Sequence, residues 1–547
     1  MNLEELLDWF RPPIVNSRTG SRRRRRFWAE PLEDRTLLAN FHVLTGGDGT
    51  LGSCTGAGCT LRDAVNAANA SPGPDEITFA GNFFDSDPTD ESYSITLDSE
   101  LVVTESLTIN GFGEAALSIS GNDATRLFRF GGSGANTYTL NNLTLAHGSV
   151  HAGGGGAVVM ELDADDTLNI HHTVIRDSSA SEGGGVYSVA GTLNIRNSAV
   201  VNNEASSIGG GLALRNGTTT LTNVTISGNQ AASQGAGIDN TSVGEATGLT
   251  ILNSTIVNNS GPSGTNLRNF DQSGGATVVI QNSVFAMPQG SSNIENFGAA
   301  ATITSLGNNI SDDATGNLNA TGDKQNTPAQ LGPLRYNNSN LPTHAPLFGS
   351  PAIDAGADLS GSGVTTDQRG FNRPQGAAFD IGAHEARFDF GDAPTAAQSG
   401  LTTSYPTVIA DSGAVHSALG PRLGTNRDAE TNGQPDVNAR GDDAVEFDDE
   451  DGIIFASAGF LTRGASNSIQ VDLQNADASS NRLDAWVDFD HNGVWESSEK
   501  VFASFDLGTT DGVQTKPSDR CQEAVRLMLR EPSPSASITR TPYSPVS

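Results

Sequence analysis

The stretch Gly-Thr-Leu-Asn-Ile-Arg-Asn-Ser-Ala-Val-Val-Asn-Asn, residues 191–203, carries the pattern that decides the fold. Two apolar residues and an Asn follow one another at two-residue spacing, and a further apolar residue stands three positions after the Asn. The pattern occurs six times between about residues 138 and 285, and Thr219 and His172 are its two departures. The six registers are Tyr138/Leu140/Asn142/Leu145, Leu168/Ile170/His172/Ile175, Leu193/Ile195/Asn197/Val200, Thr219/Leu221/Asn223/Ile226, Leu249/Ile251/Asn253/Ile256 and Val278/Ile280/Asn282/Phe285.

The spacing of these repeats indicates a solenoid. Their starts, at positions 138, 168, 193, 219, 249 and 278, are 25 to 30 residues apart, a period typical of solenoid proteins. A helical repeat would place apolar residues three and four apart, whereas these units alternate every second residue, as strands do. The sequence therefore predicts a mainly β chain: a right-handed parallel β-helix solenoid followed by a smaller β-sandwich-like domain.

The Asn and Gly residues of the repeat have separate physical uses. Asn amides that stack in neighbouring turns can hydrogen-bond to one another. Glycine clusters, such as Gly183–Gly185 and Gly209–Gly211, stand about 15 residues after each start and precede a second short strand. There we expect corners at which the backbone needs a positive φ or neighbouring turns approach closely.

Composition and charge limit the classes of function. The chain of 547 residues is too long for one hydrophobic core, and 63 glycines with 36% hydrophobic residues favour thin repeated layers. A formal net charge of -32 repels phosphate backbones, so cations are more natural ligands than nucleic acid. Solvation of an exposed protein is the alternative explanation of the charge. No run of 18 or more apolar residues occurs, so we expect no transmembrane segment.

Residues 1–40 are interpreted as a targeting or disordered N-terminal segment. The basic block Arg22–Arg26 is followed by Pro-Leu-Glu-Asp-Arg-Thr-Leu-Leu-Ala at 31–39, which is similar to an N-terminal motif of large bacterial surface proteins. This stretch is too charged for the apolar core of an ordinary signal peptide, so a misassigned start or a basic disordered arm are the alternatives. Cys54 and Cys59 are spaced to close a small disulfide loop in an oxidising compartment, and a reduced pair is the alternative.

The repeats resemble a known class of bacterial surface protein. Three glycines before an apolar strand, then Leu-x-Ile-x-Asn-Ser and Asn-Asn, are similar to the repeats of polymorphic outer-membrane proteins and related right-handed β-helix surface proteins. Residues 54–69 resemble the CSLREA domain, which commonly opens such proteins. Residues 61–70, which overlap this stretch, form an expected amphipathic helix that covers the N-terminal end of the solenoid. The β-helix with this cap is expected over residues 41–310.

Further resemblances divide the rest of the chain. Residues 311–386, with Gly-Ser-Pro-Ala-Ile-Asp-Ala-Gly at 349–356, resemble the choice-of-anchor Q region, which implies coupling to surface sorting, and we expect them to cap the solenoid. Residues 387–512 resemble the acidic, β-rich GEVED domain of bacterial extracellular proteins. Residues 513–547 are basic and rich in Ser and Pro, and no strands of that family are evident there. They are interpreted as a disordered or truncated tail.

The clearest chemical motif is Asp-Phe-Asp-His-Asn-Gly-Val-Trp-Glu-Ser-Ser-Glu at 488–499. It fits the twelve-position calcium loop, with oxygen-bearing side chains at positions 1, 3 and 5, Gly at 6 and Glu at 12. The expected calcium ligands are Asp488, Asp490, Asn492, the backbone carbonyl of Val494, and Glu499. The strand-like segment before the loop argues against an EF-hand, and a surface acidic turn is the alternative. The acidic run at 442–451 matches no ligand spacing and is interpreted as a solvated stretch.

Catalytic motifs are not recognisable in this sequence. It holds no nucleophile elbow, no phosphate-binding loop with its Lys and no zinc-ligand spacing. A β-helix enzyme would place carboxylates or basic groups along an outer groove. The residues available for this are Asp163, Asp165, Asp166, His171, His172, Arg176 and Asp177. Because His172 occupies the Asn position of the repeat, its expected role is structural.

These observations favour an extracellular or cell-surface bacterial protein of structural or adhesive type, with an accessory module that binds calcium. Surface glycans, matrix or other surface proteins are the expected partners. The main alternative is a carbohydrate-active β-helix enzyme, a polysaccharide lyase or hydrolase. A third is a component of a large assembly in which coils meet edge to edge.

Overall fold

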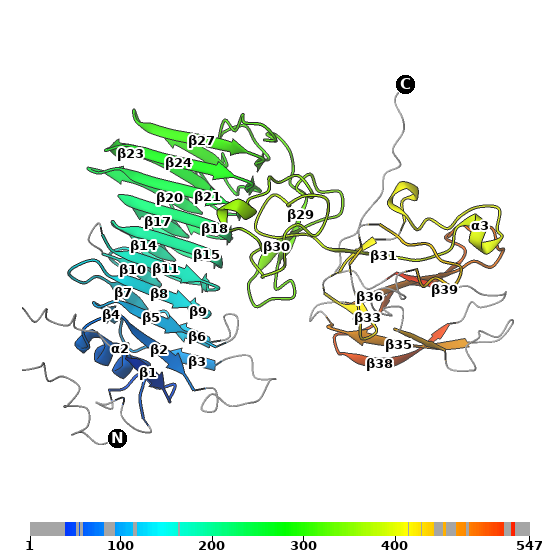
Figure 1. Ribbon diagram of the computed structural model, residues 1–547, viewed down its shortest axis with the longest axis horizontal. Helices are drawn as coiled ribbons and strands as arrows, with labels where there is room; N and C mark the ends of the chain where they lie inside the picture. The colour runs from blue at the N-terminus through cyan, green and yellow to red at the C-terminus, as the bar shows by residue number, and fades with distance from the viewer. Residues whose placement is uncertain are drawn as a thin grey trace, which may run out of the picture. The chain divides into compact units, whose positions relative to one another are not determined.

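Figure 1 shows the computed structural model of the chain. It describes residues 39–50, 54, 58–80, 93–112, 117–161, 165–413, 415–418, 420–427, 429–430, 432–441, 452–455, 467–476, 481–518 and 527–530. The N-terminal motif, Asp163 and the acidic run 442–451 therefore lie outside the described residues.

The chain winds through about eight turns of a parallel β-solenoid, which is shown in blue to green in Figure 1. Its strands form three long stacks and one short one. The first stack consists of β1 (Asn40–Val43), β2 (Asp75–Phe79), β5 (Leu107–Asn110), β8 (Thr137–Asn141), β11 (Thr167–His171), β15 (Thr192–Val201), β18 (Gly217–Ser227), β21 (Thr247–Leu252), β24 (Ala276–Gln281) and β27 (Ala301–Gly307). The second consists of β3 (Tyr93–Thr96), β6 (Leu117–Ser120), β9 (Leu143–Ala146), β12 (Val174–Arg176), the later halves of β15 and β18, β22 (Thr255–Val257), β25 (Val284–Ala286) and β28 (Ile310–Ser311).

The third stack follows the glycine clusters. It consists of β4 (Leu101–Val103), β7 (Phe128–Phe130), β10 (Val158–Met160), β14 (Val186–Ser188), β17 (Leu212–Arg215), β20 (Ile238–Val243), β23 (Leu267–Ser273) and β26 (Ile294–Phe297). The short stack consists of β13 (Ser179–Glu182), β16 (Glu204–Ile208) and β19 (Gln230–Ala231).

Equivalent residues of successive turns lie above one another. Leu193 pairs in register with Leu168 on one side and with Thr219 on the other. The same column continues through Leu249 to Val278. Inward side chains of the three long stacks are buried in one continuous hydrophobic core along the solenoid. The repeat alignment, the mainly β class and the parallel solenoid are therefore confirmed.

The Asn position of each repeat forms the bend between the first and second stacks. The residues there are Asn142, His172, Asn197, Asn223, Asn253 and Asn282, and their φ angles lie between 45° and 57°. Asn enters this left-handed region at less cost than most residues with a Cβ. Neighbouring side chains also stack: Asn223 Nδ2 donates to Asn197 Oδ1 at 3.0 Å, and Asn197 Nδ2 lies 3.2 Å from His172 Nε2. His172 thus takes the structural place expected for it.

A second ladder of Asn side chains lies inside the bend after the second stack. Asn203 Nδ2 donates to Asn229 Oδ1 at 3.0 Å, and Asn229 Nδ2 donates to Asn259 Oδ1 at 2.9 Å. The backbone N–H groups of Asn203 and Asn229 donate to the same two oxygens, each at 3.0 Å. All three residues have no exposed surface. Each amide therefore satisfies backbone groups that the bend would leave buried without partners.

Gly210 shows why a glycine is needed at the corner before the third stack. A Cβ at this position would lie 2.2 Å from the carbonyl oxygen of Gln230 and 2.6 Å from that of Ala236, both in the next turn. Such distances are far inside van der Waals contact. The corner therefore requires the close backbone approach that only glycine allows.

The helix α2 (Leu61–Ala70) lies at the N-terminal end of the solenoid, where the amphipathic pattern predicts a helix (Figure 1). Thr60 and Asp63 form a capping box at its start. Leu61 and Val65 are buried in the core of the solenoid. Asn69 donates to the carbonyl oxygen of Val102 in β4 at 2.7 Å. The helix thus supplies apolar and polar partners to the first turns.

Residues 312–386 contact the solenoid in two ways. Residues 312–327 pack on the last turn, with Leu318 in the main core and the Lys324 N–H bound to the Asn309 carbonyl at 2.7 Å. The remainder includes β29 (Leu331–Arg335), β30 (Thr343–Pro346) and the 3-10 helix η2 (Ser360–Ser362). It lies on the outer face of the second stack, where Gln368 accepts a hydrogen bond from Thr225 Oγ1 at 2.6 Å. The expected end cap therefore applies to the first part of this segment, whereas the larger part covers the flank.

Two buried ion pairs hold this flank segment together. Arg369 pairs with Asp367 at 2.6 Å, and Arg373 pairs with Glu385 at 2.6 Å, and none of the four side chains has exposed surface. Asp380 lies beside them, because its backbone N–H donates to Glu385 Oε2 at 3.0 Å. Burial and the neighbouring Glu385 charge raise the pKa of Asp380 to about 7.

The C-terminal module consists of short antiparallel sheets. Its elements are β31 (Phe388–Phe390), α3 (Ala396–Ser399), the 3-10 helix η3 (Ile409–Asp411), β32 (Val415–Ser417), β33 (Arg422–Leu423), β34 (Ile453–Phe455), β35 (Asn467–Gln474), β36 (Arg482–Val487), β37 (Lys500–Asp506), β38 (Gly512–Ser518) and β39 (Leu527–Arg530). Side chains from β35 in one sheet and from β36 and β37 in another share one hydrophobic core, as in a sandwich.

Strand pairing in this module continues past residue 512, the end expected from the sequence. Strand β38 pairs with β35 from Gly512 to Ser518, and β39 pairs with β36. These strands are not evident in the local sequence, because their pairing partners lie about 40 to 50 residues earlier in the chain.

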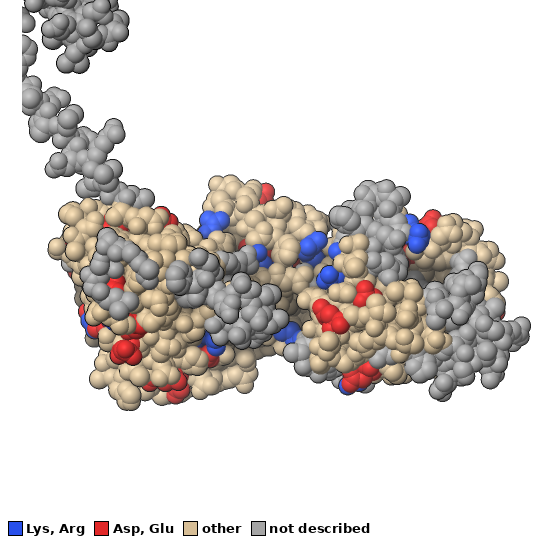
Figure 2. All heavy atoms as spheres, turned by 90° about the horizontal axis from the view of Figure 1, so that it is seen from below, with Lys and Arg blue, Asp and Glu red and all other residues tan. Residues whose placement is uncertain are grey.

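Figure 2 shows one face, on which acidic and basic side chains are interspersed among a larger uncharged area. Among the described residues, no helix has the length and apolarity needed to cross a membrane.

Replacing Asn229 with Leu should destabilise the solenoid by about 3 kcal/mol or more, because the Val200 carbonyl and the Asn203 amides lose buried partners. Chemical unfolding followed by far-UV circular dichroism measures this loss. Asn319→Leu is the matched control, since Asn319 is exposed. Equal stability of the two variants would contradict the role of the buried ladder.

Asp380→Asn should gain stability relative to the native protein as the pH rises from about 5.5 to about 7.5. The folded pKa of Asp380 lies above its unfolded value, so folding favours the protonated form, and this contribution is lost as the pH rises through about 7. Burial lowers the pKa values of His344 and His384 in the same segment, which acts in the opposite direction. Their effect is common to both proteins and cancels in the difference. A difference in unfolding free energy that does not change with pH would contradict this assignment.

Candidate functional site

The predicted calcium loop, residues 488–499, joins two antiparallel strands. β36 leads into it and β37 leads out of it. The Val487 N–H donates to the Glu499 carbonyl at 3.0 Å and closes the base of the loop. Gly493 has a φ of 78°, which a residue with a Cβ reaches only at a cost, so the sharp turn at position 6 depends on glycine. The flanking strands agree with the expectation that this is not an EF-hand.

Three of the predicted ligand side chains converge. Carboxylate oxygens of Asp488, Asp490 and Glu499 all lie within 4.8 Å of one another. Backbone amides hold two of these carboxylates in place: Gly493 N–H donates to Asp488 Oδ2 at 3.0 Å, and Phe489 N–H donates to Glu499 Oε1 at 2.7 Å. Three converging carboxylates offer the hard oxygen donors that Ca²⁺ prefers. The residues present therefore fit a calcium ion.

Asn492 and Val494 are placed differently from the three carboxylates. The Asn492 Oδ1 atom accepts a hydrogen bond from the Val494 N–H at 2.7 Å, and Asn492 Nδ2 donates to Asp490 Oδ2 at 3.1 Å. Asn492 Nδ2 also donates to Glu496 Oε1 at 2.8 Å. Glu496 stands at position 9 of the loop, a position that often coordinates calcium through a water molecule. The sequence motif could therefore have named Glu496 among the expected ligands.

The loop is electrostatically prepared for a cation. Burial raises the pKa of Asp488. Hydrogen bonds from Tyr405 and from backbone amides of the loop lower it by a larger amount together, so the pKa of Asp488 lies below its ordinary value. Burial and the nearby Glu496 raise the pKa of Glu499. In the described part of the module, the ion pairs join residues other than the three loop carboxylates, such as Lys500 with Asp484. A cation would therefore relieve repulsion among the loop carboxylates.

A neighbouring segment supports the loop from outside. Tyr405 Oη donates to Asp488 Oδ2 at 2.8 Å, and the Tyr405 ring stacks on Trp495 with centroids 4.6 Å apart. Thr403 Oγ1 donates to the carbonyl oxygen of Asn492. These contacts fix the loop on the module, and no motif near residue 405 announces them in the sequence.

The catalytic candidates on the solenoid have different surroundings and partners. Asp166 accepts a hydrogen bond from the Asn136 N–H at 2.6 Å and has no exposed surface. Arg176 pairs with the adjacent Asp177 at 2.6 Å. Burial lowers the pKa of His171, with a further contribution from His172. Asp165 is at a turn, and Asp163 lies outside the described residues.

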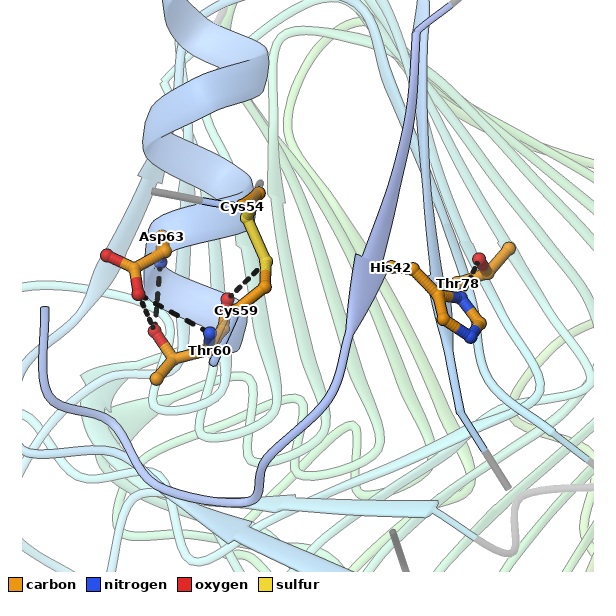
Figure 3. Close-up of a disulfide and its surroundings, with 6 residues drawn as sticks. All are labelled: His42, Cys54, Cys59, Thr60, Asp63 and Thr78. Atoms are coloured by element: carbon orange, nitrogen blue, oxygen red, sulfur yellow. Dashed lines mark hydrogen bonds between the residues drawn. A yellow bond between two sulfur atoms is a disulfide. The ribbon is translucent and has the colours of Figure 1, made fainter. Parts of the chain in front are cut away.

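Cys54 and Cys59 are joined by a disulfide next to the start of α2 (Figure 3). Cys59 is fully buried and belongs to the solenoid core, and Thr60 directly after it caps the helix. The disulfide therefore closes a short loop against the capped end of the helix.

The outer face of the third stack carries a groove that the sequence motifs missed. It has a volume of about 610 Å³, and its lining includes Tyr187, Arg215, Gln234, Arg268, Phe270 and Gln272. Strand alternation was the available signal in the sequence: because Leu267 faces the core, Arg268 and Phe270 both lie on the outer face of β23. In the register between β23 and β26, Phe270 is paired with Phe297. The two rings stack with centroids 5.6 Å apart.

A buried carboxylate organises the floor of this groove. Arg215 Nη1 donates to Asp239 Oδ2 at 2.6 Å, and Arg268 Nη1 donates to Asp239 Oδ1 at 2.8 Å. Asp239 has no exposed side-chain surface. Burial lowers the pKa of Arg215. The neighbouring Asp239 and Glu182 together raise it by a larger amount, so the guanidinium pKa lies above its ordinary value. Arg215 therefore stays charged and fixed in the groove.

Comparisons with known proteins add little to this description. No protein-family model matches the chain, and no curated protein matches it. Among solved structures, the crystal structure of pectate lyase Pel9A matches with 12% sequence identity and a TM-score of 0.37, over 64% of this chain and 97% of the other. So distant a likeness transfers no chemistry. The resemblances to CSLREA, choice-of-anchor Q and GEVED domains stay predictions from the sequence.

Proposed function

We propose that this is an extracellular or cell-surface bacterial protein with a structural or adhesive role. The solenoid serves as a scaffold that presents its outer faces to surface glycans, matrix or other surface proteins. The C-terminal module binds calcium through Asp488, Asp490 and Glu499, with Asn492 and the carbonyl of Val494 completing the loop.

The observation that carries this proposal is the convergence of three carboxylates within 4.8 Å in a loop of calcium-binding pattern. Calcium loops of extracellular modules bind Ca²⁺ with dissociation constants of about 0.1 to 1 mM. Only calcium concentrations outside the cell are high enough to occupy such sites. A disulfide at Cys54 and Cys59 suits the same oxidising surroundings. Calcium binding and location outside the cytosol therefore support one another.

The intact protein should bind one calcium ion with a dissociation constant of about 0.1 to 1 mM, measured by isothermal titration calorimetry. Asp490→Ala should weaken binding at least about tenfold, because it removes one converging carboxylate from an exposed position where the fold tolerates the change. Asp506→Ala is the matched control, since Asp506 is a 57% exposed carboxylate on β37 outside the loop. No heat and no thermal stabilisation at about 5 mM calcium would refute the calcium assignment.

Incubation of the protein with neutral and acidic polysaccharides should release neither reducing ends nor unsaturated sugars. Asp166 is buried and bound to the Asn136 backbone, and Arg176 pairs with Asp177, so these candidates have structural partners, which supports a role without turnover. Protease treatment of intact source cells should remove the protein from their surface. Clear turnover would instead establish the alternative, a carbohydrate-active β-helix enzyme.

A further inference from the structure

Two guanidinium groups and three carboxylates meet at the floor of the third-stack groove. Arg215 contacts Asp239 at 2.6 Å and Glu182 at 2.8 Å. Arg268 contacts Asp239 at 2.8 Å and lies 3.8 Å from Glu295 at the edge. The guanidinium groups are also nearly buried, with 9% and 11% of their side chains exposed. The floor is therefore rigid and has no excess positive charge with which to attract an anion.

Aromatic rings line the groove beside these charges. The guanidinium carbon of Arg215 lies 5.7 Å from the Tyr187 ring centroid, and that of Arg268 lies 4.2 Å from the Phe270 centroid. Phe297 stacks on Phe270 and continues this line into the next turn, with 64% of its surface exposed. An exposed aromatic residue beside a formed groove is typical of a binding surface.

Uncharged polar side chains complete the lining. Gln234, Gln272 and Asn216 contribute amides, each of which can both donate and accept hydrogen bonds. Hydroxyl groups, which also donate and accept, are their natural partners. The groove volume of about 610 Å³ lies within the range of about 300 to 1,000 Å³ common for ligand sites.

The groove suits an elongated ligand. Tyr187 lies on β14 and Phe270 on β23, and the stack places β17 and β20 between them. Since neighbouring strands lie about 4.8 Å apart, the two aromatic positions are separated by about 14 Å along the solenoid. A ligand that contacts both must span several turns.

The geometry points to a binding site for an uncharged polysaccharide chain in the third-stack groove. The hydroxyl groups of such a chain pair with the amides and with the edges of the fixed Arg215 and Arg268 side chains. Its apolar ring faces pack against Tyr187 and against the exposed ring of Phe297, which stacks on Phe270. This site rests on the proposed role of the solenoid in binding surface glycans, and it names the ligand class and the residues.

The test is calorimetry of the full chain with xylohexaose, mannohexaose, cellohexaose and maltohexaose, and with oligogalacturonate as an anionic probe. We expect at least one neutral hexasaccharide to bind with a dissociation constant of about 10 μM to 1 mM. Raising the salt concentration from about 0.05 to about 0.5 M should leave this affinity unchanged, because no net charge is neutralised. Phe297→Ala and Gln272→Ala should each weaken binding about fivefold or more.

Leu306→Ala is the matched control, because Leu306 is an apolar residue on β27 with 53% of its surface exposed outside the groove. Binding of oligogalacturonate alone, with strong salt dependence, would overturn the uncharged ligand. Neutral-glycan binding that both groove variants retain would overturn the site while leaving the glycan-binding role in place. No binding of any probe would overturn the site, whereas the calcium and cell-surface measurements would still decide the proposed function independently.

Discussion

The hydrogen bonds between successive turns are the constraint on which the rest of the structure depends. In a parallel stack these bonds hold each turn at a fixed distance of about 4.8 Å from the next, so every side chain lies directly above its counterpart. Each position must therefore tolerate a similar residue above and below it. Apolar side chains do so by packing in columns, as from Leu168 to Val278, and Asn side chains do so by donating to one another.

The repeat itself was readable because this constraint acts on every turn. The spacing of apolar residues predicted the column alignment, and the Asn position predicted a stacked ladder. The left-handed bend at Asn197 and the deeper ladder at Asn229 were harder to foresee. They depend on where the backbone turns inward, and that is fixed by contacts between turns and not by the sequence of one turn.

The two candidate sites differ in the same respect. The calcium loop is contained in twelve consecutive residues, so its three converging carboxylates could be predicted from spacing alone. Its support by Tyr405 and the groove around Asp239 are assembled from residues far apart in the sequence. Strands β38 and β39 were not predicted for the same reason, because the strands with which they pair lie about 40 to 50 residues earlier in the chain. Single-sequence patterns reveal what is local or repeated, and these features are neither.

The flank segment has a mechanical consequence for the solenoid. In a repeat protein each turn contacts only its neighbours, so a pulling force can peel turns from one end in succession. Here, residues 344, 366 and 368 hydrogen-bond to Ser227, Asn223 and Thr225 in the turn of β18. Residue 383 hydrogen-bonds to Thr255 in the next turn. Asn282, one turn further on, is bound to the same segment through the carbonyl of Ala357 at 2.7 Å. Under tension these turns must yield together, so the segment acts as a splint along the shaft.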